Sequence, residues 1–271
     1  MKSLGTVYIV GAGPGNPDLI TVRGLMCLRG ADVVLHDRLV DLHLLEEARP
    51  DAEIINVGKE PHNESIENIE KIENIENIEN IQQEHIRWLM IEKAREGKNI
   101  CRLKGGDPFV FARGAEEARA LAEAGIPFEI VPGVSSAIAV PAYAGIPVTH
   151  RDHAHSFMVI AGSRSHDLQS PQWLAASQLV KAGGTVIVLM GLSRLAAIVA
   201  RLLSNECDPA TPVALISRGT YLIQDCRTAT LAEIVNEAAG LKPPATMVIG
   251  QVVSLRSSIQ WMELAEKFEF E

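Results

Sequence analysis

The sequence predicts an α/β protein with two domains, each built around a β-sheet. Short apolar runs alternate with stretches of helical periodicity, glycines and polar residues follow those runs directly, and a crossover rich in glycine and proline lies mid-chain. Alternating strands and helices are typical of a mostly parallel sheet with covered faces. The 271 residues fit one large domain or two ordinary ones.

Composition excludes several classes of protein. A hydrophobic content of 47% argues against global disorder, and a net charge of −9 argues against a general nucleic-acid binder. No apolar run is long enough to span a membrane or to form a signal peptide. The cysteines lack metal-type spacing and fit a reducing compartment: Cys27, Cys101, Cys207 and Cys226. We therefore expect a cytoplasmic protein.

The first domain is expected to span residues 1–133. Its β-branched and apolar runs predict five strands, at 6–10, 31–35, 52–57, 99–103 and 128–131. Helical spacing of apolar residues predicts helices over 19–29 and 83–95.

Between the third and fourth strands, residues 66–81 repeat isoleucine at every third position. On an α-helix such a stripe drifts about 60° per repeat and winds around the surface. A short internal duplication explains it better than a designed interface. We expect a surface protrusion, mobile or loosely helical, that supplies a net −4 of the charge through five Glu and one Lys.

The second domain is expected to span 153–271 after a crossover linker over 134–152. Its predicted strands are 156–161, 185–190, 213–217 and 247–253, and its predicted helices are 168–181, 195–203 and 231–239. The segment 224–230 fits a strand that pairs antiparallel, which would make this second sheet mixed.

The loop after the first strand, Gly11-Ala12-Gly13-Pro14-Gly15-Asn16-Pro17, is rich in glycine. It fails the dinucleotide fingerprint because Asn16 occupies the place of the third glycine. It also fails the phosphate-binding Walker pattern, since no Gly-Lys-Ser/Thr follows. With these two motifs excluded, the segment is interpreted as a strand followed by a loop that a ligand can approach.

The segment 102–111 reads Arg-Leu-Lys-Gly-Gly-Asp-Pro-Phe-Val-Phe. Gly105 and Gly106 allow a sharp turn and close approach by a ligand. Asp107 before Pro108 fits an N-cap at the start of a short helical turn. Open α/β sheets place their ligands just past the carboxyl ends of strands, so we expect a binding site here.

Taken together, these motifs resemble the uroporphyrinogen-III C-methyltransferases of the tetrapyrrole methylase family. The resemblance covers about residues 5–255. It is carried by the glycine loop, His36 to Val40, Val57 to Lys59, the 102–111 segment, Pro132 to Ser136, 145–152, Met190-Gly191, Pro212 to Ala214 and 244–250. It implies two α/β domains with the active site in the cleft between them, usually a homodimer, and S-adenosylmethionine as methyl donor.

The resemblance also assigns residues. Donor binding falls on Pro14, Gly105, Gly106, Asp107, Val110, Ser135, Ser136, Met190 and Gly219. Backbone groups of bare loops suit the amino-acid part and adenine of the donor, and a carboxylate suits its positive charge. For Met190, core filling is an equally good explanation without the family.

Asp37 and Lys59 match positions with acid and base roles in the family. Each follows a predicted strand directly. From the residues alone, Asp37 would brace a turn and Lys59 would be a solvated charge.

Basic residues surround the loops of the first half: Arg23, Arg38, Arg102, Lys104, Arg113 and Arg151. Against a substrate with eight carboxylates, Arg38, Arg113 and Arg151 are candidate clamps, because guanidinium binds carboxylate bidentately. His150, His153 and His155 lack an accompanying acidic or cysteine ligand cluster, so we expect no metal site. These histidines would instead lie near the substrate or simply be exposed on the surface.

The activity that the resemblance implies is two C-methylations of uroporphyrinogen III, giving precorrin-2 for sirohaem or cobalamin. A methylase of a later corrin intermediate and an inactive donor-binding scaffold are the alternatives. The chain departs from the family pattern at Asn16, His36, Ala112 and Ala115 and in the 66–81 insert. No dehydrogenase-ferrochelatase pattern is present, so we expect that step on another protein.

Overall fold

The computed structural model describes residues 3–58, 72–163 and 167–262, with 72–81 described by their backbone alone. Contacts divide the chain into two units, Met1–Val134 and Ser135–Glu271. Each unit contains its own five-stranded sheet. The prediction of two α/β sheets, the first parallel and the second mixed, is confirmed.

The first sheet has the order β3-β2-β4-β1-β5 and is parallel throughout. Its strands are β1 (Val7–Gly11), β2 (Val33–His36), β3 (Glu53–Asn56), β4 (Ile100–Lys104) and β5 (Phe128–Val131). All five lie within a residue or two of the predicted ranges. β-branched side chains favour these runs because they pack well on a pleated, buried surface.

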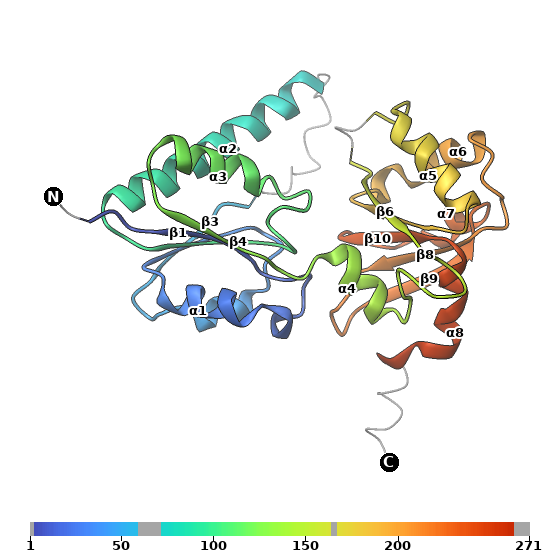
Figure 1. Cartoon of the computed structure of the whole chain (residues 1–271), viewed down its shortest axis with the longest axis horizontal. Helices are drawn as coiled ribbons and strands as arrows, with labels where there is room; N and C mark the ends of the chain where they lie inside the picture. The colour runs from blue at the N-terminus through green and yellow to red at the C-terminus, as the bar shows by residue number, and fades with distance from the viewer. Residues whose placement is uncertain (1–2, 59–71, 164–166, 263–271) are drawn as a thin grey trace, which may run out of the picture. The chain divides into compact units, whose positions relative to one another are not determined.

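Helices cover both faces of this sheet (Figure 1). α2 (Ile72–Arg95) and α3 (Gly114–Glu123) lie on one face, and α1 (Val22–Gly30) lies on the other with the short 3-10 segments Pro17–Leu19 and Leu42–Glu47. Alternate strand residues serve the two faces. Val33 and Leu35 pack with residues of α2 and α3, whereas Val34 packs with residues of α1.

The second sheet has the order β6-β7-β10-β8-β9. Its strands are β6 (Phe157–Ala161), β7 (Thr185–Leu189), β8 (Pro212–Ser217), β9 (Asp225–Thr230) and β10 (Ala245–Ile249). β6 and β7 are parallel, and the other pairs are antiparallel. The antiparallel strand expected over 224–230 is thus confirmed as β9.

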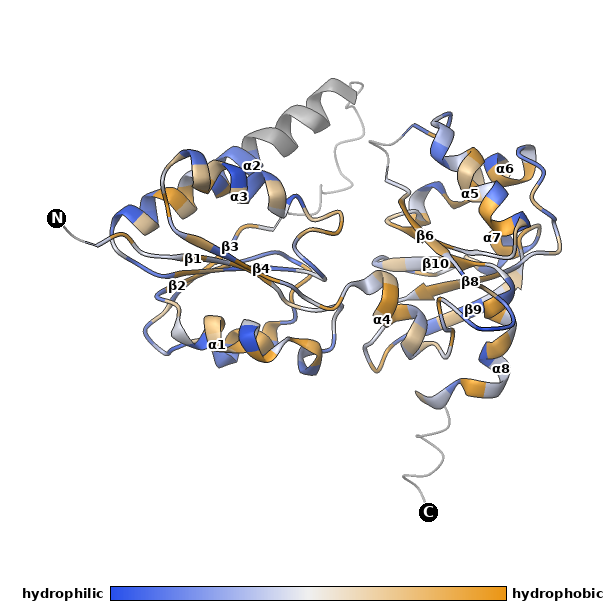
Figure 2. Ribbon diagram, viewed as in Figure 1, coloured by the Kyte–Doolittle hydropathy of each residue, from blue (hydrophilic) through white to orange (hydrophobic). Residues whose placement is uncertain are grey.

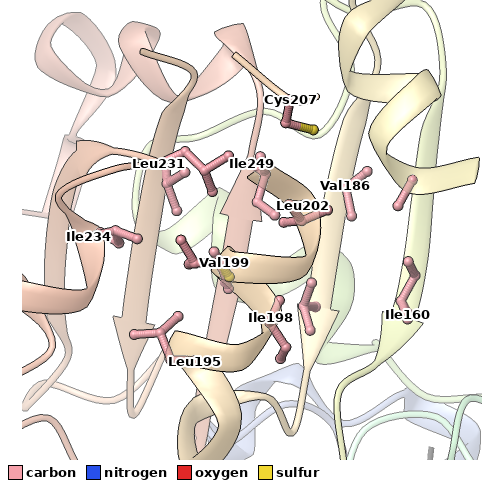
Figure 3. Packing of buried hydrophobic residues seen from close by; sticks show 14 of the residues in the cluster. Ile160, Val186, Leu195, Ile198, Val199, Leu202, Cys207, Leu231, Ile234 and Ile249 are labelled. Carbon is pink, nitrogen blue, oxygen red and sulfur yellow. The ribbon is translucent and has the colours of Figure 1, made fainter. Parts of the chain in front are cut away.

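The helices of the second unit are α4 (Ser136–Tyr143), α5 (Pro171–Lys181), α6 (Leu195–Ser204), α7 (Ile234–Glu237) and α8 (Arg256–Ile259). Leu195, Ile198, Val199 and Leu202 of α6 pack with residues of the sheet such as Val186 (Figure 3). In Figure 2 most residues of β1 and β8 are hydrophobic, as expected for strands whose two faces are both covered.

Four features differ from the sequence-based expectation. The strand expected over 247–253 ends at Ile249, because Gly250 at φ 139° turns the chain into a 3-10 segment, Gln251–Leu255. The helix expected over 231–239 shortens to α7. The predictions above did not include α3. The expected linker over 134–152 contains α4, whose Ala137 packs on Ile187 and Leu189.

The isoleucine repeat falls partly outside the described residues. Residues 72–81 form the amino-terminal part of α2, continuous with the helix expected over 83–95. Within the described part of the chain, no helix is long and apolar enough to cross a membrane.

A candidate active site at the carboxyl ends of the first sheet

The connections that follow two neighbouring strands of the first sheet, β1 and β4, run in opposite directions across the sheet. From β1 the chain passes through α1 to β2, whereas from β4 it passes through α3 to β5, on the opposite side of this strand pair. Loops that diverge in this way leave a crevice at the carboxyl ends, where open α/β sheets bind their ligands. The predicted site residues of this unit follow these strands.

Four glycines bring the end of β1 and the loops after β1, β4 and β5 into backbone contact. Gly13 donates its N–H to Gly106 O at 3.3 Å, and Gly106 donates its N–H to Gly13 O at 2.7 Å. A Cβ on Gly133 would lie 2.3 Å from Gly106 O, and one on Gly11 would lie 2.5 Å from Gly133 Cα. Gly11 and Gly133 admit only glycine because the backbones themselves touch, and Gly13 and Gly106 have left-handed φ values of 84° and 69°.

Gly105 differs from these four. Among the described residues, a Cβ there would meet only Leu39 Cβ, at 3.7 Å, and its backbone does not adopt a positive φ. The fold therefore does not require glycine at this position. A half-buried glycine with open space at its Cβ position, as far as the described residues show, fits the close approach of a ligand.

Asp107 joins two of the loops. Its Oδ1 accepts from Phe109 N–H at 2.8 Å, and its Oδ2 accepts from Gly133 N–H at 3.0 Å. The first bond shapes a turn at Pro108, but no helix begins until Gly114, so the expected helical turn is only a turn. The carboxylate has a structural task beside any role towards a donor.

The chain between Asp107 and α3 exposes apolar side chains. Phe109, Val110 and Phe111 are 54%, 37% and 45% exposed. Phe111 and Arg113 adopt left-handed φ values of 54° and 60°, which non-glycine residues rarely do. Strained backbone and exposed apolar groups together are typical of a binding loop.

Asp37 follows β2 directly, and its backbone N–H donates to Leu103 O at 3.1 Å. Its side chain is 31% exposed, and its Oδ1 accepts from Arg102 Nη2 at 2.6 Å. An ionic partner that is itself buried fixes the carboxylate at the edge of the sheet. Lys59, the other predicted acid-base residue, lies outside the described residues.

Arg102 and Lys104 lie under the site and not on its surface. Each is 1% exposed, because alternate residues of β4 point towards α2 and α3 together with Ile100. Both contact Glu117 of α3, Arg102 Nη2 at 3.2 Å and Lys104 Nζ at 2.9 Å. The expectation that these two residues belong to a basic set around the loops is therefore wrong, because both side chains are buried.

The second unit holds the remaining candidate donor-binding residues. Met190 follows β7 with φ 58° and is 49% exposed, while Arg218 and Thr220 flank Gly219 with φ values of 49° and 74°. Ser135 caps α4, its Oγ accepting from Ala137 N–H at 3.3 Å. An exposed Met190 in a strained conformation does not fit core filling.

A family model described as Tetrapyrrole (Corrin/Porphyrin) Methylases matches residues 6–235. This range includes both sheets except β10.

The chain belongs to the tetrapyrrole methylase family.

Relatives within this family are similar over most of the chain. A siroheme synthase of Hahella chejuensis is 42% identical over 265 residues, which are 97% of this chain and 53% of that protein. The chain thus spans about half the length of the curated relatives that it matches.

Solved structures agree with the fold along their whole length. The uroporphyrin-III C-methyltransferase of Thermus thermophilus is 38% identical with a TM-score of 0.75, covering 94% of this chain and 98% of that one. It has also been solved in complex with S-adenosylhomocysteine. A cobalt precorrin-4 methyltransferase is 25% identical with a TM-score of 0.75, covering 92% and 95%.

Two departures of this chain from the family pattern, Asn16 and His36, are accommodated locally. Asn16 Oδ1 accepts from Asp18 N–H at 2.9 Å and caps a 3-10 segment, a task that aspartate performs equally well. His36 is buried, with its Nδ1 3.1 Å from Asp37 O. Neither residue disturbs the loops described above.

The outer basic residues differ in their surroundings. Arg38 and Arg151 are exposed, and Arg113 donates through Nη2 to Glu116 Oε2 at 2.8 Å.

Pro14 is half-buried in the loop after β1. The rings of His150 and His153 lie 4.8 Å apart, and among the described residues no group of three or more potential ligands converges on a metal position.

Sequence reasoning missed Glu117 as part of the site. Its side chain is fully buried and contacts Arg102, which in turn contacts Asp37. The available signal was a glutamate on the inner face of a short amphipathic helix, and the alternation of Ile100, Arg102 and Lys104 along β4.

Proposed function

We propose that the protein is an S-adenosylmethionine-dependent methyltransferase that converts uroporphyrinogen III to precorrin-2 by methylating two ring carbons. The observation that carries the proposal is the loop of Gly105 to Val110, which leaves Gly105 bare at the strand ends next to Asp37. The similarity to the Thermus methyltransferase over nearly its whole length supports this substrate.

The donor-binding residues proposed in the first unit are Pro14, Gly105, Gly106, Asp107 and Val110. S-adenosylmethionine supplies an electrophilic methyl group on a positively charged sulfonium. Bare backbone at Gly105 suits close contact with such a ligand, and the carboxylate of Asp107 adds a negative charge within the same loop. The residues present therefore fit the donor.

In the second unit, the proposed donor-binding residues are Ser135, Ser136, Met190 and Gly219. A Cβ on Gly219 would lie 2.4 Å from Val140 Cγ1, so glycine there is required by packing on α4 as well. The left-handed residues on both sides hold this turn in one conformation.

The proposed chemistry transfers one methyl group at a time. A pyrrole carbon forms a C–C bond with the methyl, the C–S bond breaks, S-adenosylhomocysteine leaves, and the macrocycle loses a proton. Asp37 is the proposed acceptor of that proton or the counter-ion for positive charge on the ring, and Lys59 the proposed acid or carboxylate partner. Positioning the two reactants in line supplies much of the rate.

Arg38, Arg113 and Arg151 are the proposed partners of substrate carboxylates. Of these, Arg38 stands next to Asp37 in the same loop and is exposed. We further propose a homodimer located in the cytoplasm, in line with the family.

The test is anaerobic incubation with uroporphyrinogen III and S-adenosylmethionine, read by product mass. Addition of two methyl groups is the expected result. Turnover of a precorrin without addition to uroporphyrinogen III would favour the alternative of a later corrin methylase. Binding of S-adenosylhomocysteine without turnover of either substrate would favour an inactive scaffold.

A further inference from the structure

One carboxylate oxygen in the first unit receives an unusual number of hydrogen bonds. Glu117 Oε1 accepts from Lys104 Nζ at 2.9 Å, from Gln83 Nε2 at 3.0 Å, and from Arg102 Nη2 and Nε at 3.2 and 3.3 Å. The other oxygen, Oε2, is buried and has no hydrogen-bond partner among the described residues. The donors come from α2 and β4 and converge on α3.

Arg102 connects this group of residues to Asp37 in the candidate site. Its Nη2 lies between Glu117 Oε1 and Asp37 Oδ1, at 3.2 and 2.6 Å, and its Nη1 donates to Leu103 O at 3.0 Å. The guanidinium is therefore held from below by Glu117 and from the side by the strand. Its contact with Asp37 joins this buried guanidinium to a carboxylate that is 31% exposed.

The charges in this group balance. Arg102 and Lys104 are two buried cations, and Glu117 and Asp37 are the two carboxylates beside them. Burial and the neighbouring Arg102 lower the pKa of Lys104. Without the charge of Glu117, two buried cations would face the single carboxylate of Asp37.

We propose that Glu117 is a positioning residue for catalysis, acting on Asp37 through Arg102. Glu117 fixes the guanidinium of Arg102 and balances the positive charge of Lys104. Arg102 therefore presents one N–H group to Asp37 in a single orientation. This inference rests on the proposed function of Asp37. On this proposal, the buried side chain of Glu117 affects turnover without touching the substrate or the donor.

Burial alone would give Glu117 a purely structural role, and the two roles predict different results. Removing one member of a buried ionic group destabilises a fold because it leaves uncompensated charge, whereas removing an anion and a cation together restores the balance. A positioning role requires the ionised carboxylate itself, because a neutral amide oxygen holds a guanidinium more weakly.

The experiment compares Glu117→Gln, the double variant Lys104→Met/Glu117→Gln and Glu123→Gln with the wild type. Glu123 is a matched control on α3, exposed and paired only with Arg119 among the described residues. For each protein, kcat and KM for uroporphyrinogen III, the Kd of S-adenosylhomocysteine and Tm are measured.

We expect Glu117→Gln to lower kcat roughly tenfold or more, with the Kd of S-adenosylhomocysteine changed less than about threefold. The double variant should recover Tm but keep the low kcat, and Glu123→Gln should match the wild type. Recovery of kcat together with Tm in the double variant would overturn the inference, as would normal kcat in Glu117→Gln or failure of both variants to fold. An inactive wild type would instead refute the proposed function.

Discussion

At the residue scale, the glycines beside the candidate site have different reasons to be glycine. Gly11 and Gly133 lie where the loop backbones touch, and Gly106 has a left-handed φ of 69°. Gly105 has neither constraint. Gly105 lies in the proposed donor-binding loop, and the described fold does not require glycine there. A substitution at this position therefore tests binding separately from folding.

We therefore expect Gly105→Ala to weaken binding of S-adenosylhomocysteine at least about tenfold while Tm stays near that of the wild type. Gly133→Ala is the control, because its Cβ would collide with Gly106 O and lower stability by about 1–3 kcal/mol. Calorimetric titration and thermal unfolding distinguish the two. Unchanged affinity in a stable Gly105→Ala protein would remove this loop from the donor site.

The proposed acid-base residues give a second prediction at this scale. Asp37→Asn and Lys59→Met should each lower turnover at least about tenfold, since a positioned acid or base contributes about 10²–10⁴-fold. Donor affinity should change only a few-fold. If the two act as one unit, the double variant loses less than the product of the single losses. Normal turnover in both single variants would leave solvent as the proton acceptor.

At the element scale, the described side chains of α2 show how this helix packs on the first sheet. Among them, Gln83, Ile86, Met90 and Ala94 are buried at helical spacing, and the last three pack in the core with β1 and β4. The repeat lies before all of them. Additions at such a place cost little because loop entropy grows slowly with length.

Deletion of residues 66–81 should therefore change Tm by less than about 3 °C and turnover by less than about twofold. Thermal unfolding and the methylation assay measure both. Loss of folding or of the expected dimer on deletion would show that the isoleucines of the repeat are buried in an interface.

β4 carries a prediction about pH. Burial lowers the pKa of Lys104 below its ordinary value of 10.5. Between the lowered pKa and 10.5, the unfolded chain holds a proton that the folded chain has released, so this residue makes the free energy of unfolding rise with pH. Below that window both states are protonated and its contribution is constant.

Denaturant unfolding of the wild type and Lys104→Met at about pH 8 and pH 10 measures this effect. The wild type should gain stability relative to the variant at the higher pH. A constant difference between the two proteins would mean that Lys104 keeps its ordinary pKa in the folded state.

At the scale of the whole molecule, each unit has a hydrophobic core of its own, and proposed donor-binding residues occur in both. Amide hydrogen exchange with and without S-adenosylhomocysteine should therefore show protection at 105–107 and also near Met190 and Gly219. Protection confined to 105–107 would restrict the donor site to the first unit.

The sequence by itself determined the alternation of strands and helices, the parallel and mixed sheets and the family. These depend on local periodicity and on short motifs, such as the run from Gly105 to Asp107, that are complete within a few residues. The positions of nearly all strands followed for the same reason.

Only the tertiary structure decided the environment of each charge and each glycine. Arg102 and Asp37 are 65 residues apart in sequence and meet because β2 pairs with β4. The burial of Lys104 and the role of Glu117 depend on how α3 packs against that strand. Side-chain burial is set by such long-range packing, which local periodicity does not encode.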